Sequence, residues 1–495
     1  MDTRSTQHIV RVVGAVLVSA SVWAPAVSAE RPQANVEAGR AAYQQSCARC
    51  HGLQGQGDGR DAKRLYPRPR NLTEGVFKFR STTSGAAPTD DDLFHTVTHG
   101  LTPGNMPDWR HLDDDTRWHL VEYVKTLSQA FEGEAPQPLP IGRDPGARHA
   151  DVRKGREVYE KLGCAACHGA TGRAEGTSAP TLVDNWSRAI RPANLTHGWT
   201  YRGGSEAQAI VTRLMTGIDG TPMPSYAEAV SPEDAWSLAY YLRSIQQEPR
   251  WTAIVRAAQI EGDAPTAIDD PRWQQAETVN VLLRNVPNAA GEITRPQTVD
   301  SVQVQAITTT DAVSFRIVWD DPTDDHEAQP DRLALALRPA GVDGDTVSLQ
   351  AWPLKESPPL DIALWSADAG RTVEGVAHDV DAIAARAVPS QPLEGEAAYR
   401  DGRWTAVLAR PLTVPMLGTA AQLGSRRFTP IGFSIWDGGN ERQQAVSMWI
   451  DVDVRGTMVG HHAKDKTRSG ASAWVWLASA AALVIGFGLA CKRAS

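Results

Sequence analysis

Two short cysteine motifs dominate the chemistry that this sequence can support. Four of its five cysteines lie in Cys47-Ala48-Arg49-Cys50-His51 and Cys164-Ala165-Ala166-Cys167-His168. A C-x-x-C-H segment is typical of covalent haem attachment, because one helical turn presents two thiols to the haem vinyl groups and the adjacent His then faces the iron. The candidate attachment residues are Cys47, Cys50, Cys164 and Cys167, and the candidate proximal ligands are His51 and His168.

A methionine follows each motif at the same distance. Met106 and Met223 both lie 55 residues after the histidine of their motif, in loops rich in Gly and Pro. A thioether sulfur is a soft second axial ligand that raises the reduction potential of a haem iron. We therefore expect Met106 and Met223 to be the distal ligands. The alternatives are four nearby histidines: His95, His99, His111 and His197.

Other uses of the four cysteines fit less well. The two pairs are 117 residues apart, too far for a zinc ribbon. A redox dithiol lacks its usual βαβ surroundings, and disulfides between the pairs remain conceivable outside the cell. None of these alternatives explains a His after each second Cys and a Met at matched distance. The pattern therefore favours two covalently bound haems c.

The sequence around the motifs is also duplicated. Arg68-Pro69-Arg70-Asn71-Leu72-Thr73 matches Arg191-Pro192-Ala193-Asn194-Leu195-Thr196, and each copy ends in an amphipathic helical pattern. Residues 34–130 and 150–247 are thus predicted to be two copies of one small all-α domain. A Pro- and Gly-rich linker over residues 136–145 joins them.

Each copy resembles a class I c-type cytochrome domain, in its C-x-x-C-H motif, its Pro-x-Asn-Leu loop and its Met-Pro loop. The resemblance implies one-electron transfer. An iron with six ligands leaves no open position for a substrate, so these domains are expected to relay electrons rather than to catalyse. A dihaem peroxidase would need one open haem, and the matched methionines speak against it.

The two ends of the chain look like targeting segments. Residues 1–29 carry Arg4 and Arg11 before an apolar stretch and a small-residue cleavage pattern, as in an export signal. Residues 471–491 form an uncharged run long enough to cross a bilayer once. The alternative for residues 1–29 is an uncleaved N-terminal anchor, and the alternative for residues 471–491 is a buried helix of a soluble domain. We expect a protein on the periplasmic side of the bacterial inner membrane, held by a single-pass C-terminal anchor.

Composition narrows the remaining function classes. The 495 residues carry a net charge of −8, with no long basic run, which argues against a nucleic-acid partner. Mean hydropathy is −0.34, which excludes a polytopic membrane protein. Hydrophobic residues make up 41%, as in a globular chain.

Residues 250–455 have a strand-like sequence pattern instead of a helical one. Alternation such as Val313, Phe315, Ile317 and Trp319 predicts strands, with others at 278–283, 332–337, 403–408, 430–436 and 446–454. We predict a β-rich sandwich domain. The acidic runs 90–92 and 320–325 are interpreted as a helix start or a solvated loop, with an electrostatic docking face for a basic redox partner as the alternative.

This third domain resembles the haem-binding γ subunit of ethylbenzene dehydrogenase and its relatives in dimethylsulfide dehydrogenase, selenate reductase and chlorate reductase. The matching stretches include Val318-Trp319-Asp320-Asp321, Asp361-Ile362-Ala363-Leu364-Trp365 and Ile435-Trp436-Asp437-Gly438. The family holds a haem b between a Met and a Lys, and Lys355 and Met416 are the nearest substitutes here, with roles exchanged. The alternatives are a solvated Lys355, a core Met416 and a haem-free docking domain.

The resemblance implies a partner. The γ subunits serve molybdopterin oxidoreductases of the dimethylsulfoxide-reductase type, so we expect an electron-transfer subunit that works with molybdopterin and iron–sulfur subunits or with a soluble cytochrome. The alternative is a self-standing membrane cytochrome that feeds a terminal oxidase or reductase and uses its β domain for docking.

Overall fold

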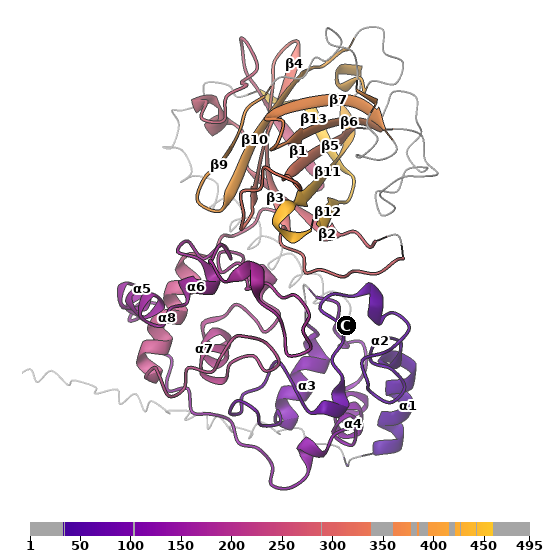
Figure 1. Ribbon diagram of the computed structural model, residues 1–495, viewed down its shortest axis with the longest axis vertical. Helices are drawn as coiled ribbons and strands as arrows, with labels where there is room; N and C mark the ends of the chain where they lie inside the picture. Colours follow the sequence, from indigo (N-terminus) through magenta and orange to yellow (C-terminus); the bar gives the residue numbers. More distant parts are fainter. Residues whose placement is uncertain are drawn as a thin grey trace, which may run out of the picture.

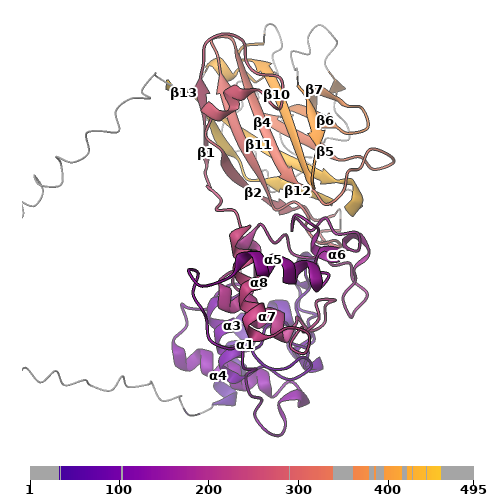
Figure 2. The same cartoon turned by 90° about the vertical axis from the view of Figure 1, so that its left-hand side faces the viewer.

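A computed structural model describes residues 33–458, apart from 34, 102–103, 289, 338–359, 378–383, 386–394, 415–420, 426 and 442. Helices occupy one half of the molecule and strands the other (Figure 1), and the side view in Figure 2 shows the same division. The predicted export signal, the predicted anchor at 471–491, Lys355 and Met416 all lie outside the described residues. Within the described part, no helix combines the length and the apolar character needed to span a bilayer.

The helical half consists of two similar sets of four α-helices. The first set is α1 (Val36–Ser46), α2 (Ala48–His51), α3 (Asp90–His99) and α4 (Asp114–Lys125), and the second is α5 (Val152–Lys161), α6 (Ala165–His168), α7 (Ala207–Thr216) and α8 (Pro232–Ser244). The acidic run 90–92 forms the first turn of α3, where Thr89 and Asp92 make a capping box. The prediction of a helix start is therefore confirmed for this run.

In each set the first and last helices cross at a glycine. A Cβ atom on Gly39 would lie 1.9 Å from the carbonyl oxygen of His119, and one on Gly155 would lie 2.1 Å from that of Ser237. Only a residue without a side chain allows backbones to approach this closely. The crossing fixes the end of α1 or α5, and with it the cysteine motif that follows directly.

The linker between the two sets is attached to both. The amide of Leu139 donates to the Ser81 carbonyl at 2.8 Å. Trp236 of α8 donates its indole N–H to the Ile141 carbonyl, also at 2.8 Å. Residues 136–145 therefore follow a defined path over both helical units.

The other half is a single β-rich unit. Its strands are β1 (Ile254–Gln259), β2 (Val279–Asn285), β3 (Ser301–Thr308), β4 (Ala312–Asp320), β5 (Arg332–Leu337), β6 (Leu360–Ser366), β7 (Arg371–Ala377), β8 (Ala384–Ala385), β9 (Ala397–Tyr399), β10 (Arg403–Pro411), β11 (Phe428–Asp437), β12 (Gln443–Ser447) and β13 (Ile450–Met458). The order is β8-β7-β6-β5-β11-β12-β2-β3-β4-β10-β9. β1 pairs in parallel with both β13 and β3, and β13 pairs with β11. These pairings join all thirteen strands into one sheet that closes on itself.

The apolar residues of the predicted alternation lie in the core of this unit, although Ser314 and Val318 between them are buried too. Val313, Phe315, Ile317 and Trp319 of β4 are at most 1% exposed. Trp319, Trp365 and Trp404 pack together, with ring centroids of Trp365 and Trp404 4.7 Å apart. The stretch predicted as one strand at 446–454 is instead two, because β12 pairs with β2 whereas β13 pairs with β1.

The end of β4 contacts the second helical unit. Asp320 accepts hydrogen bonds from His197 and from Asn194, at 3.0 and 2.9 Å, and from Arg403 of its own domain at 2.7 Å. His197 also contacts Asp300 at 3.0 Å. Asp320 is 7% exposed and Asp321 is fully buried. The interpretation of this acidic run as a solvated loop was therefore wrong at these two positions, and at Asp320 the second helical unit provides the contacts.

His197 carries a positive charge at neutral pH in this contact. Burial by itself lowers the pKa of His197, but the carboxylates of Asp300 and Asp320 outweigh it and raise the pKa from 6.5 to about 9. Burial likewise opposes ionisation of Asp320, yet His197 and Arg403 hold its pKa well below the usual range. The interface thus contains a buried ion pair that depends on one histidine proton.

This arrangement predicts a stability that falls in alkali. Because the pKa of His197 is raised in the folded state, this residue adds to the free energy of unfolding. The addition is complete below about pH 6.5 and is lost as the pH rises through about 9, and it amounts to about 3 kcal/mol. His197→Gln should be less stable near pH 6.5 and should lack this pH dependence in guanidinium unfolding. His111→Gln, at an exposed position, serves as the control. Equal pH dependence in the wild type and in His197→Gln would contradict the prediction.

Candidate functional site

The two C-x-x-C-H motifs adopt the same local structure. Each occupies a four-residue helix that starts directly after its first cysteine, at Ala48–His51 and Ala165–His168. Tyr43 donates its hydroxyl to the Gly52 carbonyl at 2.9 Å, and Tyr159 donates to Gly169 at 2.6 Å. A buried tyrosine of the preceding helix therefore fixes the end of each motif.

The ring of each motif histidine is oriented by a backbone carbonyl. Nδ1 of His51 lies 3.1 Å from the Arg70 carbonyl oxygen, and Nδ1 of His168 lies 2.9 Å from that of Ala193. Burial lowers the pKa of both rings, so they are neutral at pH 7. A neutral ring that donates from Nδ1 has an unprotonated Nε2, which is the form that binds a metal.

Burial raises the pKa of three of the motif thiols. Burial raises the pKa of the Cys47 thiol to about 12 and that of Cys164 to about 11. Burial also raises the pKa of Cys50, and Asp61 adds to the effect. All four cysteines are free in the structure. Two thiols and an imidazole in one helical turn are the donor set that covalent haem attachment requires.

The two methionines lie in matching turns. The amide of Leu101 donates to the Met106 carbonyl at 2.9 Å, and that of Ile218 donates to Met223 at 3.1 Å. Each turn begins after a glycine with positive φ, at 64° for Gly100 and 69° for Gly217. A Cβ on Gly100 would lie 2.5 Å from the Pro107 backbone. The repeated Gly…Met-Pro pattern thus begins with the same glycine conformation and ends with the same backbone hydrogen bond in both copies.

The alternative histidines lie elsewhere. His95, His99 and His111 are exposed. His197 is buried, but both of its ring nitrogens contact aspartates. Three of these four alternative ligands are thus at the surface. His197 is the exception, because the β-rich unit covers it.

Sequence reasoning missed a group of buried cations near the first Arg-Pro-x-Asn loop. Burial lowers the pKa of Lys78 to about 7, and the charges of Arg70 and Arg202 add to the effect. Burial also lowers the pKa of Arg213 to about 10. Nε of Arg70 and Nε and Nη1 of Arg213 have no hydrogen-bond partner among the described residues. Buried donors of this kind fit an anionic group such as a haem propionate.

The two motif regions contact each other directly. Arg70, whose carbonyl holds His51, donates from Nη2 to the Asp219 carbonyl at 3.2 Å, and Asp219 lies in the loop that leads to Met223. Arg80, fully buried, forms an ion pair with the Asp219 carboxylate at 2.8 Å. The guanidinium of Arg70 also stacks on the ring of Trp186, 4.1 Å from its centroid. The loop that holds His51 of the first motif and the loop that leads to Met223 of the second are therefore joined by direct polar contacts.

Comparison with known proteins identifies the helical half. The family model for cytochrome c oxidase, cbb3-type, subunit III matches residues 34–124 and 150–242. The cbb3-type oxidase subunit CcoP of Azospirillum sp. strain B510 is 26% identical over 216 residues, which are 42% of this chain and 61% of that protein. The chain thus spans about three fifths of the length of this relative.

Two further proteins are similar to parts of the chain. The gamma subunit of chlorate reductase from Ideonella dechloratans is 26% identical over 205 residues, which are 40% of this chain and 82% of that subunit. A chain of the reducing HAO-like protein complex of Kuenenia stuttgartiensis is 36% identical, covers 43% of this chain and 98% of its own length, and superposes with a TM-score of 0.41.

The residues matched by the family model include both C-x-x-C-H helices and both methionine loops. The similarity to this cytochrome c family supports covalently bound haem c. The helical half of the chain thus resembles cytochrome c domains related to the cbb3-type oxidase subunits, and the similar proteins support haem binding and electron transport.

Proposed function

We propose that the chain is a membrane-anchored periplasmic dihaem cytochrome c that relays electrons as a subunit of a molybdopterin oxidoreductase complex. The observation that carries the relay is the contact between the two motif regions through Arg70 and Asp219. A chain that only attached two independent haems would not need the loops of one site to hold those of the other. The anchor at 471–491 and the export signal at 1–29 are part of the proposal.

Each haem would be held by four side chains of one domain. Cys47 and Cys50 would form the thioether bonds of the first, and His51 and Met106 would bind its iron. Cys164, Cys167, His168 and Met223 would do the same for the second. When bound, haem c supplies reversible one-electron chemistry at its iron.

The protein's own contribution is orientation and charge. The Arg70 and Ala193 carbonyls fix the histidine rings, so that Nε2 is directed by the backbone rather than by a mobile side chain. Buried cations such as Lys78 and Arg202 would favour the reduced, more negative state of a nearby iron. A methionine on the opposite face would shift the potential in the same direction.

The β-rich unit would connect the haems to the partner enzyme. The loop that orients His168 also carries Asn194 and Arg191, which contact Asp320 and the Gly439 carbonyl of the β-rich unit at 2.9 and 3.0 Å. A partner bound to that unit would therefore lie next to the second haem site. The likeness to the gamma subunit of chlorate reductase supports an oxidoreductase partner of this type.

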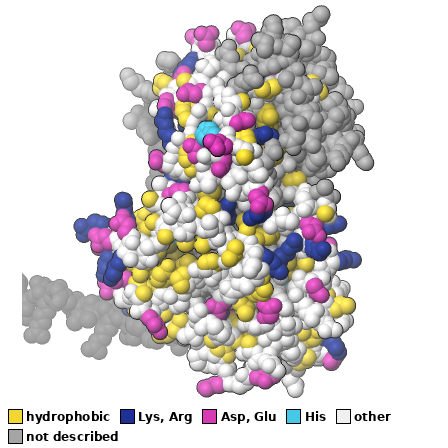
Figure 3. Space-filling model, viewed as in Figure 1, with side chains coloured by type: hydrophobic (Ala, Val, Ile, Leu, Met, Phe, Trp, Pro, Cys, Tyr) yellow, Lys and Arg dark blue, Asp and Glu magenta, His cyan; other side chains and the backbone are white. Residues whose placement is uncertain are grey.

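A terminal oxidase is the second candidate partner. The matched family and four of the similar proteins are cbb3-type oxidase subunits. In this alternative the cytochrome domains would deliver electrons to an oxidase, and the β-rich unit would serve for docking only. On the face shown in Figure 3, acidic and basic side chains are interspersed over both halves, so no field of a single sign selects between these partners there.

Haem attachment gives the first test of the proposal. In a host with a cytochrome maturation system, the wild type should carry two covalent haems by intact mass. Cys47→Ala/Cys50→Ala and Cys164→Ala/Cys167→Ala should each retain one, because the thioether bonds need their own cysteine pair. Cys491→Ala is the matched control and should keep both. Two haems in either double variant would refute these attachment residues.

Copurification separates the two partners. Protein isolated in mild detergent from the native membrane should carry stoichiometric molybdenum and iron–sulfur clusters if the first proposal holds, since the complex would be maintained by the β-rich unit. Deleting residues 250–458 should then release the partner and leave the haem stain intact. Copurification of a haem–copper oxidase without molybdenum would favour the alternative.

A third, non-covalent haem is a further part of the proposal. Acidic acetone extracts haem b and leaves haem c attached, so one extractable haem per chain is expected if Lys355 and Met416 act as ligands. Lys355→Ala and Met416→Ala should then each abolish the extracted haem while the covalent haems persist. Extraction of no haem from the full-length wild type would make the β-rich unit a docking domain.

A further inference from the structure

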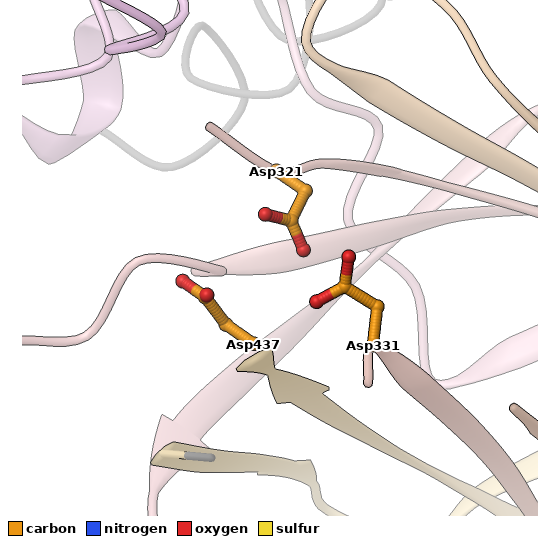
Figure 4. A group of neighbouring side chains, drawn as sticks. All are labelled: Asp321, Asp331 and Asp437. Carbon is orange, nitrogen blue, oxygen red and sulfur yellow. The ribbon is translucent and has the colours of Figure 1, made fainter. Parts of the chain in front are cut away.

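Three buried aspartates converge at the end of the β-rich unit that faces the second cytochrome domain. Asp321 follows β4, Asp331 precedes β5 and Asp437 ends β11. Their exposed fractions are 0%, 0% and 1%. One carboxylate oxygen of each lies within 4.8 Å of the others. Figure 4 shows the carboxylates of Asp321 and Asp331 pointing toward each other, with the carboxylate of Asp437 beside them.

Hydrogen bonds satisfy these carboxylates only in part. Asp331 accepts from the Trp404 indole at 3.0 Å and from the amides of Asp325 and Gly438 at 2.9 Å each. Asp321 Oδ2 has no hydrogen-bond partner among the described residues. Neither oxygen of Asp437 receives a well-formed hydrogen bond, although Thr298 and the Asn440 amide act to lower its pKa. Two fully buried carboxylates therefore direct unused oxygens into the same small space.

The surrounding positive charge is too small to balance the site. Arg191 is the cation that favours ionisation of Asp437. Its Nη2 donates to the Gly439 carbonyl at 3.0 Å, and its Nη1 has no hydrogen-bond partner among the described residues. Asp325 adds a fourth carboxylate close by, again with an unpartnered oxygen. Buried charges that are not paired cost several kcal/mol each, so the cluster needs a further cation or bound protons.

We propose that Asp321, Asp331 and Asp437 bind a calcium ion. Hard divalent cations select carboxylate oxygens. Calcium–oxygen distances of about 2.3–2.6 Å place two ligands of one ion up to about 5 Å apart, which accommodates oxygens within 4.8 Å of one another. Magnesium demands a compact octahedron with distances of about 2.0–2.1 Å and usually keeps several waters, which suits a buried site with three carboxylates less well. Asp325 is the nearest candidate for a fourth ligand.

The position of the ion gives it a structural role at the junction between domains. Arg191 and Ala193 belong to one loop, and the Ala193 carbonyl holds the ring of His168. Arg191 contacts the backbone at Gly439, two residues after Asp437. Calcium would hold the ends of β4, β5 and β11 together and so fix the surface on which this loop rests. This inference does not depend on the identity of the redox partner.

Calcium binding to the full-length holoprotein tests the proposal. After treatment with a chelator and desalting, titration calorimetry with CaCl2 should show one site per chain, and MgCl2 should bind at least tenfold more weakly. Saturating calcium should raise the melting temperature of the β-rich unit by about 5 °C or more. Asp437→Asn should weaken calcium binding at least tenfold, and Asp263→Asn, at an exposed position, should bind as the wild type does.

Several outcomes would overturn the calcium site. One is a wild type that binds no calcium and shows no change in melting temperature. Another is a chelated protein that calcium does not stabilise but acidification to pH 5 does, since the aspartates would then share protons instead of a metal. If Asp437→Asn fails to fold, the wild-type titration and Asp321→Asn decide. Haem content should be unchanged throughout, which separates a failure here from a failure of haem attachment.

Discussion

The hydrogen bond from each motif histidine to a backbone carbonyl is the constraint on which the rest of the helical half depends. The carbonyl acceptor forces the proton onto Nδ1 and leaves Nε2 available to a metal. For this to work, the Arg-Pro-x-Asn-Leu loops must be held in place, and each of them is held from outside its own domain. Arg70 reaches the methionine loop of the second domain, and Asn194 reaches the β-rich unit. The contacts between domains are thus also the contacts that orient the ligands.

The same kind of contact links the three domains in the order in which they follow along the chain. The first cytochrome domain rests on the second through Arg80 and Asp219, and the second rests on the β-rich unit through His197 and Asp320. Burial makes each of these polar contacts costly to break, because the partner would be left charged in a poorly solvated site. The rate of electron transfer falls steeply as the distance between two redox sites increases. An electron-transfer protein therefore benefits from contacts that keep this distance fixed.

The sequence was most informative where a local pattern carries the chemistry. The C-x-x-C-H spacing, the matched methionines and the alternation over Val313–Trp319 depend on neighbours along the chain, and the structure has the corresponding helices, turns and strands. It was least informative where loops from different domains meet. Asp320 looks like part of a solvated loop until His197, more than a hundred residues earlier, is placed against it. The buried cations around Lys78 and the convergence of Asp321, Asp331 and Asp437 likewise arise only from tertiary contact.

The parallel pairing of β1 with β13 has a consequence for how the chain is made. Strand β1 begins at Ile254, whereas its partner β13 begins at Ile450 and is among the last described segments. During synthesis, nearly two hundred further residues must therefore be made before β13 can pair with one edge of β1. Both helical units precede β1 in the chain, so they are already complete and have all their local contacts before that interval begins. Cofactor insertion at the N-terminal half can thus precede closure of the sheet, and a ribosome that stops short of β13 would release a protein with two unprotected strand edges.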